Sequence, residues 1–144
     1  MSKPHPPSAP PSRTPPIALP RGDLASLLAI AFDGLLDDPR AAAALLGEVE
    51  RAEVFEDDQP RAGLVRLGSR VVIHDRGRDL DRRLTLVAPE QADAGDNRIS
   101  VLSPLGTGLI GLSEGQSILW SDRRGGAMEL EVLQVLPATM EIDR

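Results

Sequence analysis

Two stretches in the first third of the chain have apolar residues at helical spacing. In the first, leucine and alanine recur every three or four residues after Asp23, a candidate N-cap. The second follows Asp38 and Pro39, a pair suited to the N-cap and first position of a helix. Because only a tight turn separates the two stretches, residues 21–55 predict a short antiparallel helical hairpin.

After residue 64 the apolar positions change from helical spacing to alternation, which is typical of strands. Four or five strands are predicted, around Val71–Ile73, Leu84–Ala88, Ile99–Val101, Ile118–Trp120 and Met128–Val135. Ser103 and Pro104 suit the N-cap and first position of one short helix that reaches about Leu112. Gly125-Gly126 predicts a hairpin between the last two strands. The expected fold is α+β, a helical hairpin followed by a small antiparallel sheet with one short helix.

Proline and polar residues set the predicted domain boundaries. Eight of the 13 prolines lie in residues 1–20, which predicts a disordered or polyproline II tail. The polar segment 56–63 predicts a linker. The hairpin over 21–55 and the linker would then precede a C-terminal domain over 64–137 and a second tail over 138–144.

Composition argues against several classes of function. The chain has no Cys and only two His, one of them in the proline-rich segment, so neither disulfides nor a His or Cys metal cluster is expected. Three aromatic residues are too few for a stacking platform that binds single-stranded nucleic acid. No apolar run approaches the ~20 residues of a membrane span, and no signal peptide is recognisable. We therefore expect a cytoplasmic protein that has no cofactor, metal or membrane contact.

The formal net charge of −6 is unevenly distributed. Residues 21–60 carry three arginines against ten acidic residues, whereas residues 61–98 carry eight arginines against six. The overall excess of acid argues against general nucleic-acid binding. An acidic arm beside an arginine-bearing unit fits a partner with a complementary surface, and solvated faces explain such charge blocks equally well.

The most distinctive motif lies between Ile99 and Trp120, where an alternating run leads into Ser-Pro and then into a glycine-punctuated apolar segment. Its characteristic positions are Ile99, Ser100, Val101, Ser103, Pro104, Gly108, Leu109, Ile110, Gly111, Gly115 and Ile118, with Gly125-Gly126 and Glu131-Val132 further on. These residues resemble the C-terminal domain of the bacterial transcript-cleavage (Gre) factors and of their relatives, the regulators of nucleoside diphosphate kinase (Rnk). Residues 46–52 also resemble the second helix of Rnk-type proteins. The resemblance implies an FKBP-like C-terminal domain and bacterial RNA polymerase as the partner.

In Gre factors the loop before the Ser-Pro helix helps to grip the rim of the polymerase secondary channel. By this resemblance, the predicted polymerase-docking residues are Ser103, Pro104, Leu105 and Gly106. Simple helix capping also explains the Ser-Pro pair, and both interpretations can hold together. The chain departs from the Gre pattern at Leu102, where Asp or Asn is frequent, and at Gln116, where Asp is frequent.

Gre factors also carry a long coiled coil whose acidic tip lies near the catalytic metal of the polymerase. The tip here would be Asp37-Asp38, on predicted helices of roughly 12–15 residues that are about 18–22 Å long. So short an arm implies a role closer to Rnk-type proteins, which is to dock at the secondary channel without stimulating cleavage and without being an enzyme. Two alternatives stay open: a cleavage-stimulating factor whose two carboxylates help to hold Mg²⁺, and a regulator that contacts nucleotide-metabolising kinases. We expect a monomer that makes no direct sequence-specific contact with nucleic acid.

Other candidate sites are interpreted as structural. An FKBP-like fold suggests prolyl isomerase activity, which needs several aromatic rings around the proline, and this domain supplies only Trp120. His74 ends a predicted strand with no Ser nucleophile pattern beside it. The alternating arginines and aspartates of residues 75–83 predict a solvated turn, with a patch for an acidic partner as the alternative.

Overall fold

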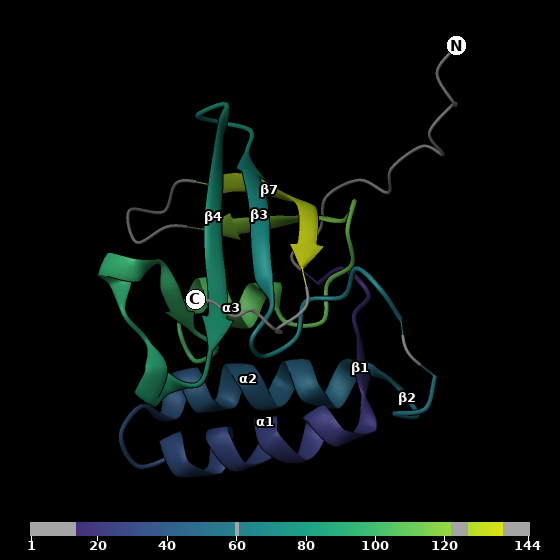
Figure 1. Ribbon diagram of the computed structural model, residues 1–144. Helices are drawn as coiled ribbons and strands as arrows, with labels where there is room; N and C mark the ends of the chain where they lie inside the picture. The colour runs from purple at the N-terminus through teal and green to yellow at the C-terminus, as the bar shows by residue number, and fades with distance from the viewer. Residues whose placement is uncertain (1–13, 60, 122–126, 137–144) are drawn as a thin grey trace.

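The computed structural model describes residues 14–59, 61–121 and 127–136 of the 144-residue chain, and its helical and sheet layers are shown in Figure 1. The elements in chain order are β1 (Ala18–Pro20), α1 (Arg21–Gly34), α2 (Pro39–Arg51), β2 (Glu53–Phe55), β3 (Arg70–Asp75), β4 (Leu80–Val87), the 3-10 turns η1 (Pro89–Gln91) and η2 (Ala94–Asp96), β5 (Arg98–Ser100), α3 (Pro104–Leu109), β6 (Ser117–Ser121) and β7 (Ala127–Leu136). Helices α1 and α2 lie side by side across one end of the main sheet. The predicted α+β fold with a helical hairpin, a sheet and one short helix is confirmed.

The main sheet has five strands in the order β5-β4-β3-β7-β6. All neighbouring pairs are antiparallel except β4 and β5, which run parallel with Thr85 opposite Arg98 and Val87 opposite Ser100. This pair differs from the predicted all-antiparallel sheet, because the turns η1 and η2 carry the chain back along β4 before β5 begins. The predicted turn at Gly125-Gly126 lies outside the described residues, as do residues 1–13 and 137–144.

Local capping chemistry sets the start of α2 but not that of α1. Asp38 is the N-cap of α2, where its side chain accepts a hydrogen bond from the Ala41 amide at 3.3 Å, and Pro39 occupies the first helical position, as predicted. Helix α1 begins earlier than predicted, and its N-cap is Pro20, which makes no side-chain cap hydrogen bond. The predicted N-cap, Asp23, lies instead inside the first turn, where the helix dipole favours a carboxylate.

The prediction of a disordered tail over residues 1–20 is wrong for residues 17–20. Strand β1 pairs in parallel with β2, and Ala18 donates a backbone hydrogen bond to the Gly111 carbonyl at 3.1 Å. Ile17, Ala18 and Leu19 are buried. Burial of three consecutive apolar side chains favours this ordered strand despite Pro15 and Pro16 before it and Pro20 at its end.

The helical hairpin and the sheet share one hydrophobic core. Leu27 and Ala31 of α1 and Leu45 of α2 are fully buried in the same cluster as Val65 and Ile110. The hairpin therefore packs through this shared core at one end of the sheet and does not project from it. The separate units predicted for residues 21–55 and 64–137 are physically continuous.

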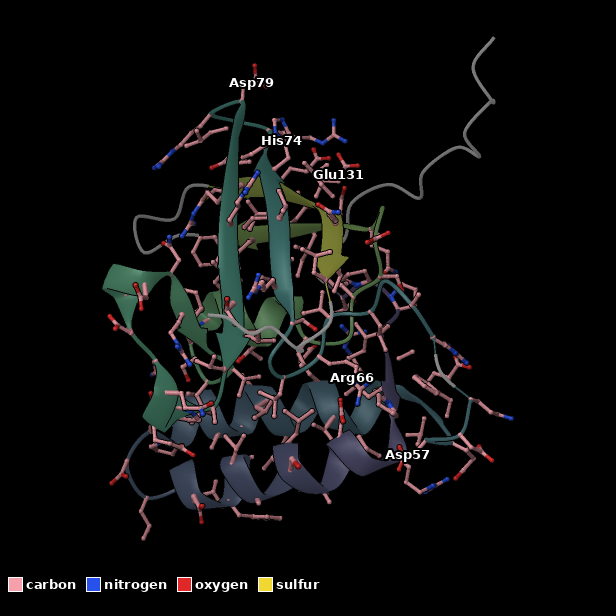
Figure 2. The ribbon with its side chains drawn as sticks, in the orientation of Figure 1. Asp57, Arg66, His74, Asp79 and Glu131 are labelled. Atoms are coloured by element: carbon pink, nitrogen blue, oxygen red, sulfur yellow. The ribbon has the colours of Figure 1, made fainter. Side chains whose placement is uncertain are left out.

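Hydrogen bonds and an ion pair connect the start of α1 to the segment between β2 and β3. Arg66 donates two hydrogen bonds to the Asp23 carboxylate, at 2.8 and 3.0 Å, and this contact raises the pKa of the Arg66 guanidinium. The Gly22 amide donates to the Asp57 carboxylate at 2.9 Å, and both Arg66 and Asp57 lie beside the hairpin in Figure 2. These contacts, together with β1 and β2, hold both ends of the hairpin at one place.

Candidate functional site

The Ser-Pro motif forms the first turn of α3. The Ser103 hydroxyl accepts a hydrogen bond from the Gly106 amide at 3.0 Å and donates one to the Ser100 carbonyl at 2.6 Å. Pro104 occupies the first helical position, where its missing N–H leaves no helical hydrogen bond unmade. The predicted cap is confirmed, although α3 ends at Leu109 rather than near residue 112.

The four predicted docking residues differ in exposure. Pro104 is exposed and Ser103 is half-buried, whereas Leu105 and Gly106 are buried. The neighbouring Thr107 hydroxyl is also buried and donates to the Val101 carbonyl at 2.6 Å. Leu105 and Gly106 therefore hold the loop in place, and Pro104 is the member of the set that a partner can reach most readily.

A hollow of about 520 Å³ lies beside Pro104. Its walls come from η2, β5, the start of α3 and β6, and they include Ile99, Leu105 and Trp120. Trp120 is half-buried against the core and is the one aromatic side chain among the described residues that line the hollow. An exposed proline next to a mainly apolar hollow is a surface suited to a protein partner.

The hairpin tip lies next to this loop. Asp37 and Asp38 occupy the turn between α1 and α2, and a Cβ added at Gly34 would lie 3.2 Å from Leu102 Cδ1. Leu102, noted in the sequence only as a departure from the Gre pattern, therefore lies close to the last residue of α1, three residues before the predicted tip. In the described part of the chain, no group of three or more His, Asp or Glu side chains is placed to hold a metal ion.

Gln116, the second departure from the Gre pattern, has a structural role. Its side-chain oxygen accepts a hydrogen bond from the Ser113 amide at 2.7 Å, and its nitrogen donates to the Pro16 carbonyl at 2.9 Å. An aspartate could accept the first bond but could not donate the second. Gln116 therefore joins the segment before β1 to the loop before β6 by hydrogen bonds.

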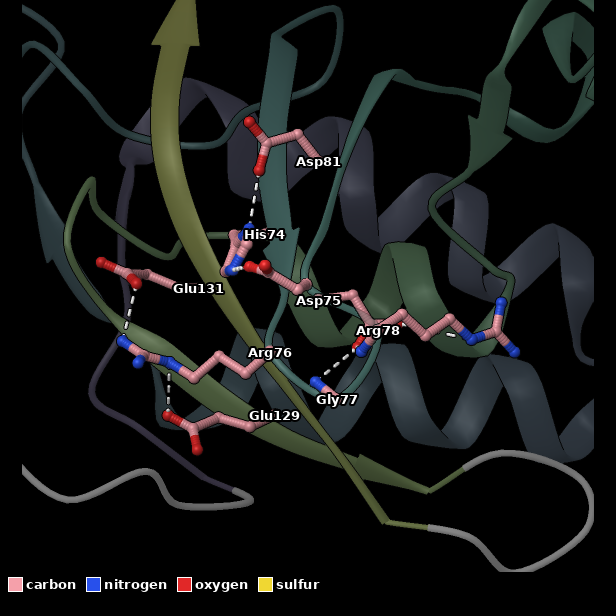
Figure 3. A network of polar contacts seen from close by, with 9 residues as sticks. His74, Asp75, Arg76, Gly77, Arg78, Asp81, Glu129 and Glu131 are labelled. Atoms are coloured by element: carbon pink, nitrogen blue, oxygen red, sulfur yellow. Dashed lines mark hydrogen bonds and ion pairs between the residues drawn. The ribbon is translucent and has the colours of Figure 1, made fainter.

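The charged residues of the β3–β4 turn form a cross-strand network at the end of the sheet opposite to the hairpin (Figures 2 and 3). Arg76 bridges Glu129 at 2.9 Å and Glu131 at 2.7 Å, and His74 Nδ1 lies 2.6 Å from an Asp81 oxygen. The buried Asp75 accepts hydrogen bonds from the backbone amides of the turn at 3.0 and 3.2 Å. Most of these side chains therefore neutralise one another, as the solvated-turn interpretation predicts.

Among the residues that the structure describes, no helix has both the length and the apolar character needed to cross a membrane.

Comparison with known proteins identifies the family. Residues 59–137 match the model of the family described as "Transcription elongation factor, GreA/GreB, C-term". The "Regulator of nucleoside diphosphate kinase" of Escherichia coli (strain K12) is 33% identical over 109 residues, which cover 72% of this chain and 80% of that protein. "Transcription elongation factor GreA" of Psychrobacter sp. (strain PRwf-1) is 38% identical over 77 residues, which cover 54% of this chain and 48% of that protein.

Among solved structures, "Prokaryotic transcription elongation factor GreA/GreB from Nitrosomonas europaea" superposes with a TM-score of 0.67 and 29% identity. The match covers 84% of this chain and 98% of that one, so it includes the helical hairpin as well as the sheet. With the Ser-Pro motif seated as its sequence predicts, the chain belongs to the GreA/GreB C-terminal family, and the regulators of nucleoside diphosphate kinase are among its relatives.

Proposed function

We propose that this protein is a transcription regulator that docks on bacterial RNA polymerase at the rim of the secondary channel and does not stimulate transcript cleavage. Membership of the GreA/GreB family supports polymerase as the partner. Exposed Pro104, beside the hollow lined by Leu105 and Trp120, offers a contact surface where the family resemblance predicts one. The observation that carries the second half of the proposal is the placement of the helical hairpin.

The hairpin is short and is held against the sheet. Helices α1 and α2 have 14 and 13 residues, which correspond to about 20 Å at 1.5 Å per residue. Their inner faces are buried in the core that they share with the sheet. Gly34, the last residue of α1, lies close to Leu102. An arm that delivers carboxylates to a distant catalytic metal has to extend well beyond its own domain, and this hairpin does not.

Docking is tested with the variant Pro104→Glu. Glutamate is tolerated in the first turn of a helix, so the fold should be kept while the exposed contact changes in charge and shape. We expect binding to immobilised bacterial RNA polymerase to weaken roughly tenfold or more. Leu80→Glu, at an exposed position at the other end of the sheet, should bind like the unmodified chain.

Equal binding by Pro104→Glu, or no binding by the unmodified chain, would contradict this docking surface. A parallel measurement with immobilised nucleoside diphosphate kinase tests the alternative suggested by the name of the Escherichia coli relative. Binding to the kinase, without binding to polymerase, would favour the alternative in which this protein regulates a nucleotide-metabolising kinase.

Cleavage is tested on backtracked polymerase complexes. We expect the unmodified chain to leave the rate of RNA cleavage unchanged, and the double variant Asp37→Asn with Asp38→Asn to behave identically. Asparagine is as good an N-cap as aspartate, so α2 should still begin normally. Cleavage that rises with the unmodified chain and falls with the double variant would establish the metal-supporting alternative.

A further inference from the structure

Helix α1 carries apolar side chains on two faces. Its inner face includes Leu27 and Ala31, which are fully buried. On the opposite side Ala25, Ala29 and Phe32 follow at spacings of four and three residues, and all three are exposed. This second stripe continues into the turn at Leu35 and Leu36. We name the outer set the α1 outer patch: Ala25, Ala29, Phe32, Leu35 and Leu36.

The α1 outer patch is unusually apolar for a solvent-facing surface. Phe32 is 59% exposed, Leu35 39% and Leu36 95%. A surface helix ordinarily has one apolar stripe and one polar face, and a helix that is apolar all round is ordinarily covered on all sides. In Figure 1 helix α1 forms the lower edge of the molecule. Within the described part of the chain nothing covers its outer face, so the patch has the character of an interface.

The charges next to Phe32 and Leu36 are mostly acidic, since Arg21, four residues before Ala25, pairs with Glu56 at 2.8 Å and Arg40 lies in the first turn of α2. Asp33, Asp37 and Asp38 flank Phe32 and Leu36 along the chain. None of these three carboxylates forms an ion pair within residues 14–59, 61–121 and 127–136. Complementary partners bring the opposite charge, so the patch favours a basic surface with apolar side chains at its centre. Two copies of this chain paired patch to patch would bring like charges together, which disfavours a symmetric dimer.

We propose that the α1 outer patch is a docking surface for an amphipathic helix of a partner protein, whose apolar stripe is flanked by Lys or Arg. A partner helix suits it because the patch is itself a helical ridge, and ridges of one helix pack into the grooves of another. This inference goes beyond polymerase docking, since it names a different surface and requires no polymerase. Gly34, which contacts Leu102, lies on the inner side of α1, so the α1 outer patch and the Pro104 loop are separate surfaces.

Three helical peptides test the proposal. They share one leucine stripe and differ in flanking residues, which are Lys, Gln or Glu, and their binding is measured by fluorescence anisotropy. The Lys peptide should bind about tenfold more tightly than the Gln peptide, and the Glu peptide should bind least. Replacing Phe32→Ser together with Leu36→Ser should weaken the Lys peptide roughly tenfold or more. Leu80→Ser, another exposed leucine, is the matched control and should have no effect.

A charge exchange makes the test specific. In Asp33→Lys with Asp37→Lys the preference should reverse, so that the Glu peptide binds most tightly. Equal binding of the three peptides, or unchanged binding by the Phe32/Leu36 variant, would overturn the proposal. A concentration-dependent dimer in sedimentation velocity that this variant abolishes would instead assign the patch to a second copy. Pro104→Glu should bind the Lys peptide normally, so failure of polymerase docking and failure of this proposal are distinguishable.

Discussion

The substitution Gly106→Ala is expected to destabilise the chain by about 3 kcal/mol or more, because it forces two backbone segments apart. A Cβ at this position would clash with the Ser100 carbonyl oxygen and would lie 2.9 Å from the carbonyl carbon. Ser100 cannot easily move, since its carbonyl accepts hydrogen bonds from both the amide and the hydroxyl of Ser103. The decrease in the free energy of unfolding is measured by urea denaturation, monitored by far-ultraviolet circular dichroism.

Gly47→Ala provides the matched control with the opposite sign. Gly47 is an exposed residue inside α2, and an added Cβ would meet nothing within 4 Å. Alanine there should stabilise the chain by about 0.5–1 kcal/mol, because glycine is the poorer helix former. If Gly106→Ala were as stable as the unmodified chain, the close approach of α3 to the end of β5 would be wrong.

The second large effect is expected for Leu45→Ala, at about 2–5 kcal/mol. Leu45 lies on α2, but its buried side chain belongs to the core that the hairpin and the sheet share. Unfolding should therefore remain a single transition, shifted to lower urea, whether it is followed by circular dichroism or by the fluorescence of Trp120 on β6.

An unchanged Trp120 transition in Leu45→Ala would mean that the hairpin and the sheet unfold separately. Leu133→Ala controls for the loss of a leucine as such, because Leu133 is 41% exposed whereas Leu45 is fully buried. It should change the free energy of unfolding by less than about 0.5 kcal/mol.

The elements that were predicted correctly are those whose signals are local. Asp38 and Ser103 each cap a helix through a hydrogen bond within three residues, and each precedes a proline, so neighbouring residues suffice to place them. The strands of the main sheet likewise follow from alternation. Strand β1 was missed because its order depends on pairing with β2, some 35 residues further along the chain. Locally, the prolines before it and at its end are typical of a tail.

The candidate site was predictable in position but not in exposure. The Ser-Pro motif located the loop, yet the burial of Gly106 follows from its packing on Ser100, which sequence spacing does not reveal. The ion pair of Arg66 with Asp23 spans 43 residues and has no sequence signal. Phe32 and Leu36 have no sequence signal of their own, because apolar residues at helical spacing predict a core-facing stripe and do not show which of two stripes is buried.

The parallel pairing of β1 with β2 has a consequence for motion. Strand β1 leads into α1 and strand β2 follows α2, so the β1–β2 pairing holds the two ends of the hairpin together. The shared core fixes the rest of the hairpin. Such an attachment leaves no hinge about which the hairpin could swing relative to the sheet. The α1 outer patch and Pro104 are therefore held at a fixed angle before any partner arrives. A partner that contacts either surface meets it already oriented, and little orientational freedom is lost on binding.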